Sequence, residues 1–227
     1  ESGWSLKHLH RLILNSQAWQ RASAVPDSQR MAAAQARDPE NRLLWRMNAG
    51  RMEAEVVRDS LLYVAGKLDL TMGGQELENT DALTTYRRSL YYAVYPEQGG
   101  RSQLGELFDA PDPLDCYRRT SSLIPQQALA LTNSDLVHSV SVAATSRILA
   151  ELSSALPDLP PAGSSATESP EAVDRFIQQA FRTLLSRAAT EQELVVCREF
   201  LQQDLPDVAR QSLVRALLNH HDFITVR

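Results

Sequence analysis

The sequence predicts a mainly α protein, an irregular helical domain with long loops and at most one short extended segment, followed by a C-terminal three-helix subdomain. Apolar residues recur at helical spacing between Arg51 and Ala65. Helix-start signals stand at Ser169 and Thr190, near the end of the chain. Only the run from Arg88 to Tyr95 has the composition of a strand. Helices therefore supply most of the expected core.

The first fifty residues contain three expected helices. Apolar side chains at helical spacing predict an amphipathic helix from Ser5 to about Trp19. A second helical stretch includes Met31 to Gln35. Asp38 and Pro39 are a cap and a first-turn proline for a third helix through Arg46, which ends in a turn at residues 48–50.

The helix from Arg51 to Ala65 is the most regular, and Gly66 stands where a left-handed C-cap is expected. Adjacent glycines at positions 73 and 74 indicate that residues 71–74 form a loop. The tyrosine- and valine-rich run from Arg88 to Tyr95 is typical of a short strand, although the sequence offers no partner strand for it.

The main helical domain is expected to span residues 1–155 and to contain the Asp/Arg-rich loop 108–120. After that loop, a short helix is predicted from Pro125 to Leu131. Residues 133–135 supply a cap for a longer helix that runs to about Leu152.

The second half of the predicted architecture follows a proline- and serine-rich linker at residues 156–170. The C-terminal three-helix subdomain is expected over residues 171–227. Its helices begin at Ser169-Pro170 and at Thr190, where Glu193 completes a capping box, and the last runs from Val208 to Leu218.

Composition limits the partners of this chain. Apolar residues make up 43% and charged residues 22%, values that favour an ordered globular protein over a disordered one. The net charge of −5, with basic residues scattered along the sequence, gives little reason to expect nucleic acid or an anionic membrane as a partner. No apolar run reaches the roughly 20 residues of a spanning helix. The sequence starts at Glu1 without methionine or signal peptide, so we expect a fragment or a processed product.

The two cysteines, Cys116 and Cys197, match no zinc, redox or haem-attachment spacing. They can pair in an oxidising compartment, but two unpaired thiols are favoured. No cofactor and no metal are therefore expected in this chain.

Three aspartates recur every third residue in the stretch after Phe108, namely Asp109, Asp112 and Asp115. The prolines between them can bend the loop so that the three carboxylates meet, an arrangement that suits Ca²⁺. Aspartates in loops also accept hydrogen bonds from turn amides and form bidentate pairs with arginine. The structural interpretation is favoured, with Arg118 and Arg119 as the neutralising partners.

Two pairs of adjacent arginines, Arg87 with Arg88 and Arg118 with Arg119, can hold an anionic ligand such as a sulfate, a uronate or a phosphate. Whether the pairs converge depends on the fold. The favoured alternative is that they form ion pairs that fix loops onto helices. Similarly, Trp4, Trp19, Trp45 and the tyrosines offer a sugar-stacking platform or, as favoured, fill the core.

Three segments in order, FDAPDPLDCYRRTSSLIPQQALALTN, NRLLWRMNAGRMEAEVVRDSLL upstream and the closing RALLNHHDFITVR, resemble a planctomycete-associated domain of unknown function, family fifteen fifty-three. The family domain is found C-terminal to c-type-cytochrome-like modules in large exported proteins. The resemblance covers nearly the whole chain and implies an extracytoplasmic setting, periplasmic or on the cell surface. It also implies a haem domain elsewhere on the parent polypeptide. The family domain extends upstream of GWSLKHLHRLIL, so the chain resembles one without its N-terminal portion.

These observations favour a non-enzymatic recognition or scaffolding module of a large exported multidomain protein. Its expected partners are other domains of the same polypeptide, or a cell-envelope protein or glycan. The alternative is a hydrolase acting on polysaccharide or another anionic polymer, with an aspartate of loop 109–115 as acid or base and Arg118 or Arg119 holding the substrate. A calcium-stabilised interaction domain is a third hypothesis.

Overall fold

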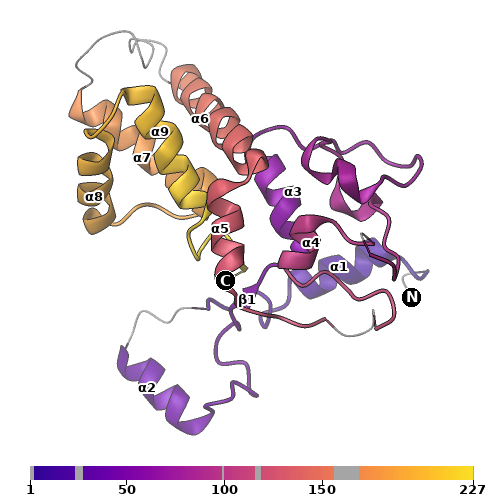
Figure 1. Cartoon of the computed structure of the whole chain (residues 1–227). Helices are drawn as coiled ribbons and strands as arrows, with labels where there is room; N and C mark the ends of the chain where they lie inside the picture. Colours follow the sequence, from indigo (N-terminus) through magenta and orange to yellow (C-terminus); the bar gives the residue numbers. More distant parts are fainter. Residues whose placement is uncertain (1–2, 24–27, 99, 116–118, 156–168, 227) are drawn as a thin grey trace. The chain divides into compact units, whose positions relative to one another are not determined.

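The computed structural model describes residues 3–23, 28–98, 100–115, 119–155 and 169–226. The protein is mainly α, as predicted, with long loops and a single two-stranded sheet in the described part of the chain. The chain divides into two compact units. Unit 1 comprises residues 1–51 together with 225–227, and unit 2 comprises residues 52–224 (Figure 1).

Unit 1 contains two helices, α1 (Leu6–Leu14) and α2 (Ser28–Arg37), and the sheet of β1 (Gly50–Arg51) and β2 (Thr225–Val226). The strands are antiparallel, with Gly50 opposite Val226. Ser5 caps α1 by accepting a hydrogen bond from the His8 amide at 3.3 Å. The predicted first and second helices are thus confirmed, although α1 ends well before Trp19.

The helix expected from Asp38 to Arg46 is wrong. The two carboxylate oxygens of Asp38 accept the amide N–H groups of Arg42 at 2.9 Å and Leu43 at 2.7 Å, which closes a turn instead of starting a helix. Asn41 and Leu44 then adopt left-handed φ angles of +54° and +55°. A residue in that region cannot continue a right-handed helix, so the segment folds as successive turns.

Unit 2 holds the remaining helices of the described residues. They are α3 (Ala54–Val64), the 3₁₀ turns η1 (Asn79–Leu83) and η2 (Ser89–Tyr91), α4 (Gln103–Leu107), α5 (Pro125–Asn133), α6 (Asp135–Ala155), α7 (Pro170–Leu185), α8 (Glu191–Leu201) and α9 (Pro206–Leu218). Figure 1 shows α6 and α9 side by side, with α7 and α8 next to α9. On the other side, α3 packs against α4 and α6.

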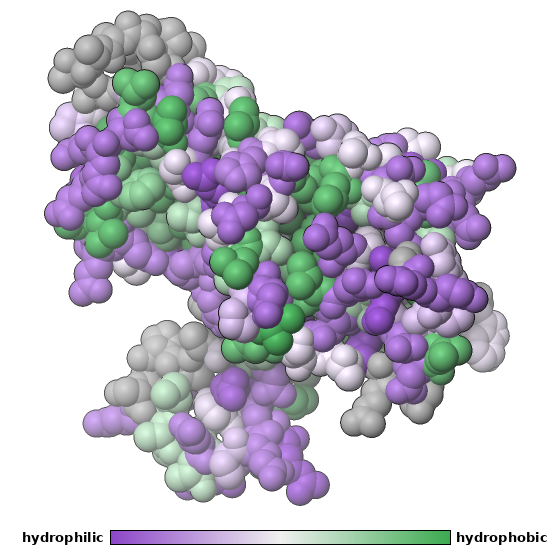
Figure 2. Space-filling model, viewed as in Figure 1, coloured by the Kyte–Doolittle hydropathy of each residue, from purple (hydrophilic) through white to green (hydrophobic). Residues whose placement is uncertain are grey.

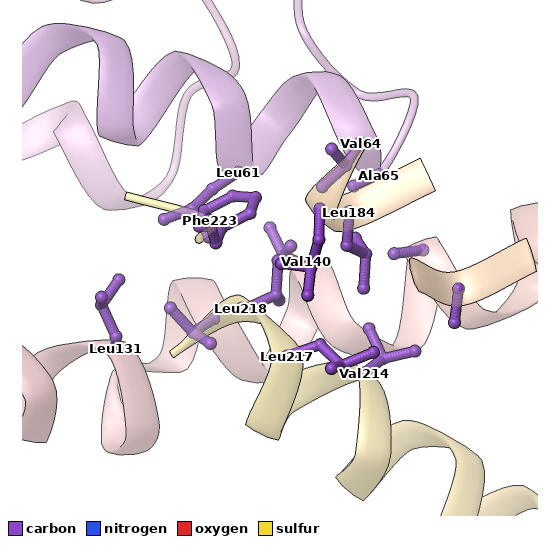
Figure 3. Close-up of a cluster of buried hydrophobic side chains, with 14 of the residues drawn as sticks. Leu61, Val64, Ala65, Leu131, Val140, Leu184, Val214, Leu217, Leu218 and Phe223 are labelled. Atoms are coloured by element: carbon purple, nitrogen blue, oxygen red, sulfur yellow. The ribbon is translucent and has the colours of Figure 1, made fainter. Parts of the chain in front are cut away.

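A single hydrophobic core joins these helices. Figure 3 shows side chains of α3, α5, α6, α7 and α9 converging with Phe223 on one cluster. Every member of the core cluster lies between residues 54 and 223. The C-terminal helices α7, α8 and α9 pack on one another, and α7 and α9 also pack on α6. Residues 156–168 of the linker predicted at 156–170 lie outside the described residues, whereas Ser169 and Pro170 are the N-cap and first residue of α7. A separate C-terminal subdomain stays a prediction.

Local signals explain most of the helix ends. Gly66 has φ +69°, and the backbone after α3 closes onto that helix with hydrogen bonds from Gly66 to Tyr63 and from Lys67 to Leu62. Ser169 caps α7 at Ala172, and Thr190 and Glu193 form the predicted capping box of α8. These predicted caps are confirmed.

The predicted strand from Arg88 to Tyr95 is largely wrong, because Ser89–Tyr91 form the 3₁₀ turn η2. Only the residues after it are extended. Leu77 donates a backbone hydrogen bond to Tyr91 at 2.8 Å and accepts one from Ala93 at 3.0 Å. The extended residues after η2 therefore pair with Leu77 through a single β-bridge, which the sequence did not reveal.

Candidate functional site

The candidate site is built around α3, beginning with a buried arginine. Arg58 is 2% exposed and its guanidinium reaches three backbone carbonyls of one loop. Nε donates to the oxygen of Ala82 at 2.8 Å, Nη1 to that of Arg87 at 2.8 Å and Nη2 to that of Thr85 at 2.7 Å. The arginine thus takes the place of secondary structure for residues 82–87, whose carbonyls would otherwise be buried without donors.

The remaining donors of Arg58 are also used. Nη1 donates to the Ser89 hydroxyl at 3.4 Å and Nη2 to the Tyr92 hydroxyl at 3.1 Å. The Tyr92 ring lies against the guanidinium, with 4.8 Å between its centroid and Cζ. Because all five N–H groups are bonded, this group holds the loop and has no donor left for a ligand. Burial lowers the pKa of Arg58, while Tyr92 and Asp59 oppose that shift.

Asp59, the residue after Arg58, binds the same loop through Ser89. Its Oδ1 accepts hydrogen bonds from the Ser89 amide at 2.8 Å and from the Ser89 hydroxyl at 2.7 Å. Its Oδ2 lies 3.9 Å from Nε of Arg88, whose side chain is 44% exposed. Arg88 is therefore held loosely at the surface of α3.

Glu55, one turn before, pairs with an arginine from the Asp/Arg-rich loop. Nη1 and Nη2 of Arg119 donate to the two Glu55 carboxylate oxygens at 2.9 and 3.1 Å, a bidentate pair. A carboxylate oxygen of Glu53 lies 3.5 Å from Nη1 of the same arginine. Burial by itself raises the pKa of Glu55, but the hydrogen bonds and charge of Arg119 bring it below its ordinary value. Loop 108–120 is thereby tied to the start of α3.

A shallow hollow of about 420 Å³, called here the α3 groove, runs along the outer face of this helix. Its apolar members are exposed except for Leu68, which is half-buried, and Asp59 and Arg88 add charge. It is lined by Glu55, Val56, Asp59, Ser60, Tyr63, Leu68, Leu70, Arg88 and Leu90. Figure 2 shows hydrophobic residues reaching the molecular surface in small patches separated by hydrophilic ones.

A smaller cavity of about 170 Å³ adjoins the α3 groove, because Glu55 and Leu90 line both. Its other walls include Arg58, Tyr92 and Arg101. Nη1 of Arg101 donates to the Ala110 carbonyl at 3.3 Å. Arg58 and Arg101, the two arginines of this cavity, therefore already donate hydrogen bonds to backbone carbonyls.

The three predicted aspartates do not converge on a metal. Asp109, with φ +60°, accepts hydrogen bonds through Oδ2 from the Ser122 amide at 2.7 Å and hydroxyl at 2.9 Å, which closes the loop. Asp112 accepts the Leu114 amide at 2.8 Å in a local turn, and Asp115 is half-buried with its amide bonded to the Asp112 carbonyl. Among the described residues, no group of three or more His, Cys, Asp or Glu side chains is placed to hold a metal ion.

The predicted arginines are spread over two places. Nη2 of Arg87 donates to the Thr71 carbonyl at 3.1 Å, and its guanidinium stacks 3.9 Å from the Tyr91 ring centroid. Arg88 and the Arg119–Glu55 pair border the α3 groove. Arg118 and Cys116 lie outside the described residues. The expected pairing of Arg119 with the loop aspartates is wrong, because its partners are Glu55 of α3 and Glu53, the N-cap residue of that helix.

Sequence reasoning missed Glu55, Arg58 and Asp59. A signal for Arg58 was present, since it falls on the same helical stripe as Ala54 and Leu61, which are buried. An arginine at such a position must find hydrogen-bond acceptors inside the protein. The tryptophans also differ from the favoured interpretation, because Trp4 and Trp19 are exposed and Trp45 is partly buried.

Two further observations concern context. No helix among the described residues combines the length and the apolar character needed to cross a membrane. Cys197 is a buried free thiol on α8, and burial raises its pKa. Cys197 is not part of the α3 groove.

Comparison with known proteins gives one match. Searches of curated proteins and of solved structures found none. A family model described as "Protein of unknown function (DUF1553)", PSD1, matches residues 1–201, most of the chain. The chain therefore belongs to the PSD1 family of proteins of unknown function.

Proposed function

We propose that this chain is a non-enzymatic recognition or scaffolding module of a large exported multidomain protein, and that its α3 groove is the contact surface. The partner is another domain of the same polypeptide or a component of the cell envelope. The extracytoplasmic setting and the haem-bearing neighbour on the parent polypeptide belong to this proposal and depend on the resemblance described above.

The observation that carries the proposal is the engagement of the charged groups around α3. Arg58 uses all its donors on the loop, Glu55 and Arg119 form a bidentate pair, and Asp109 binds Ser122. A general acid or base must reach a substrate proton, and these groups are bonded within the protein. Val56, Tyr63 and Leu90 are exposed apolar side chains of the groove, and such side chains suit contact more than chemistry.

A photo-crosslinking experiment tests the contact surface. A photoreactive phenylalanine analogue replaces Val56 in the full parent polypeptide, produced in its own host. We expect a discrete crosslinked product, either within the polypeptide or with one envelope component, and its loss when Leu90→Glu is added. The same analogue at Val196, an exposed position on α8, is the matched control.

Equal labelling from positions 56 and 196 would contradict the proposed surface. The non-enzymatic part has its own test, in which the purified chain is offered glycan and ester substrates. Turnover that disappears in the Asp112→Ala variant would establish the hydrolase alternative instead. The two tests are independent, so failure of the surface and failure of the non-enzymatic assignment are distinguishable.

A further inference from the structure

Helix α1 of unit 1 carries large apolar side chains at the protein surface. Every residue of this helix is exposed, and none belongs to the core. Leu6 is 69% and Leu12 64% exposed, while Leu9 and Ile13 are 48% and 44% exposed. A run of large apolar side chains on the surface of one helix is typical of a contact surface.

The two sides of α1 differ in chemistry. Because successive helical residues turn by about 100°, Leu6, Leu9 and Ile13 lie on one side, within about 60° of one another. Lys7 and Arg11 lie about 40° apart on the opposite side. Both cations are exposed, and among the described residues neither has an ion-pair partner. Their charges are therefore available to a partner.

The charge of this segment has the opposite sign to that of the whole chain. Between positions 2 and 26 the sequence contains three cations, Lys7, Arg11 and Arg21, and neither aspartate nor glutamate. The net charge of the chain, −5, disfavours an anionic surface as a partner. At physiological ionic strength, however, exposed charges farther apart than about 8 Å are largely screened from one another. The local charge of the segment therefore decides which surfaces α1 can approach.

Tryptophans stand on both sides of α1 in the sequence. Trp4 directly precedes the N-cap residue Ser5 and is 100% exposed, and Trp19, which follows the helix, is 48% exposed. Tryptophan is enriched where a membrane meets water, because its ring combines an apolar body with a polar N–H group. An apolar face, a cationic face and flanking tryptophans are together typical of helices that lie in a membrane interface.

From these features we infer that α1 docks on an anionic lipid surface. The helix lies in the plane of the interface, with Leu6, Leu9 and Ile13 toward the acyl chains and Lys7 and Arg11 among the headgroups. A helix of nine residues is about 14 Å long, less than half of the roughly 30 Å of a hydrocarbon core, so α1 rests on the bilayer without crossing it.

This inference goes beyond the proposed contact surface and does not depend on it. The α3 groove and α1 share no residue. A result that removes one of the two surfaces leaves the other unaffected.

The test uses the whole chain with Trp19→Phe and Trp45→Phe, which leaves Trp4 as the single tryptophan of the sequence. Vesicles of phosphatidylcholine mixed with phosphatidylglycerol are titrated into the protein while Trp4 fluorescence is recorded. We expect saturable binding with a blue shift, and quenching when the acyl chains are brominated. Binding to vesicles of phosphatidylcholine alone should be about thirtyfold weaker, because each of the two cations contributes about fivefold near an anionic surface.

Two variants and their matched controls locate the surface. Leu9→Gln removes an apolar side chain from the middle of the face, keeps a good helix former and is expected to weaken binding about fivefold or more. Leu129→Gln, on α5, where Leu129 is 58% exposed, should leave binding unchanged. Lys7→Gln is expected to weaken binding to the anionic vesicles about fivefold. Arg182→Gln, at an exposed position on α7, should have no such effect.

Three outcomes would overturn the inference. One is the absence of binding to the anionic vesicles by the folded chain. Another is equal affinity of Leu9→Gln and Leu129→Gln, which places the lipid contact elsewhere. The third is concentration-dependent dimerisation in sedimentation velocity, abolished by Leu9→Gln and without vesicle binding, which shows that the apolar face of α1 joins two copies of this chain.

Discussion

Arg58 gives the loop of residues 82–92 its conformation. A helix normally turns apolar side chains toward the core, and all the buried residues of α3 except Arg58 are apolar. At Arg58 the guanidinium meets carbonyl groups that have no ladder partner, so a charge-assisted bond replaces a strand. To accept the hydrogen bond from Arg58, the carbonyl of Arg87 must face inward, and the 3₁₀ turn η2 follows from this orientation.

Replacing Arg58 by methionine tests this role. Methionine has a similar length but leaves the carbonyls of Ala82, Thr85 and Arg87 without donors. We expect the free energy of unfolding to fall by about 3 kcal/mol or more, since each unsatisfied buried group costs about 1–3 kcal/mol. Urea denaturation followed by circular dichroism measures the change.

The control for that variant is Arg182→Met, at an exposed position on α7, which should change stability by less than about 0.5 kcal/mol. Arg58→Lys is expected to recover little, because an ammonium group cannot reproduce the planar set of five donors. Equal stability of Arg58→Met and Arg182→Met would refute the structural role.

A second charged cluster, formed by Arg187, Glu193 and Asp222, joins the segment after α9 to α8. Arg187 donates to Glu193 at 2.6 and 2.8 Å and to Asp222 at 2.8 Å. Hydrogen bonds from Arg187 lower the pKa of Glu193 from 4.5 to about 2, against the opposing effect of burial and with help from Thr190. The acid is thus held ionised in the folded protein well below its ordinary pKa.

This pair predicts a pH dependence of stability. A carboxyl whose pKa is depressed by folding stabilises the protein above its unfolded pKa, and that contribution is lost as the pH falls from about 4.5 toward 2. Glu193 is 29% exposed, so solvent screening reduces the contribution to about 1 kcal/mol. Glu193→Gln keeps the capping box and removes the charge. The difference in unfolding free energy between wild type and Glu193→Gln should be largest near pH 6 and vanish near pH 2; a constant difference would contradict it.

At the scale of elements, caps decide where helices begin and end. Gly66 ends α3 at φ +69°, where an added Cβ would lie 3.6 Å from Cδ of Arg147, an ordinary contact. The space is therefore sufficient, and only the left-handed backbone disfavours a side chain.

Gly66→Ala is accordingly expected to lower the free energy of unfolding by about 1 kcal/mol through backbone strain. Gly66→Asn should cost less, because asparagine tolerates this conformation better. Gly50→Ala is the matched control, since Gly50 lacks a positive φ and a methyl group added there would meet no atom within 4 Å. Thermal unfolding of the three variants measures the ranking, and a Gly66→Ala protein as stable as Gly50→Ala would contradict it.

The elements that the sequence predicted correctly carry their signals locally. Thr190 with Glu193, Ser169 with Pro170, and Gly66 are each recognisable within one helical turn. The two errors arose where the same residues suit two structures. Asp38 before Pro39 can start a helix or close a turn, and its carboxylate closed the turn. The tyrosine-rich run at 89–91 has strand composition, but it forms a 3₁₀ turn whose Ser89 amide donates to the Asp59 carboxylate of α3.

The candidate site was less predictable because its pairings are distant. Arg119 was identified as a candidate, but its partner Glu55 lies 64 residues away in the sequence. Asp109 was expected to meet arginine or a metal, and it binds the Ser122 amide instead. No spacing rule connects such residues, since only the packing of loop 108–120 against α3 brings them together.

At the scale of the whole molecule, the buried apolar core of the residues that the structure describes lies in unit 2. Every side chain of the main hydrophobic cluster falls between positions 54 and 223, including Leu61 of α3, Val140 of α6 and Leu218 of α9. In contrast, α1 contributes no buried residue. Hydrophobic burial is the dominant stabilising term in folding, so unit 2 should contain most of the stability.

A fragment of residues 52–224 should therefore fold on its own. We expect a cooperative thermal transition with a midpoint close to that of the whole chain, measured by circular dichroism and calorimetry. A fragment of residues 170–227 should lack such a transition, because α7 and α9 would lose their packing against α6. Cooperative folding of the shorter fragment would instead support the predicted C-terminal subdomain over residues 171–227.

The pairing of β1 with β2 has a kinetic consequence. Gly50 lies opposite Val226, and just inside them the Met52 amide donates to the Ile224 carbonyl at 2.8 Å. On a ribosome that adds about 5–20 residues per second, β2 is synthesised roughly 9 to 35 s after β1. Until then the edge of β1 is open to other chains. A chaperone that shields extended segments would find its substrate at this stage of synthesis, before β1 and β2 have paired.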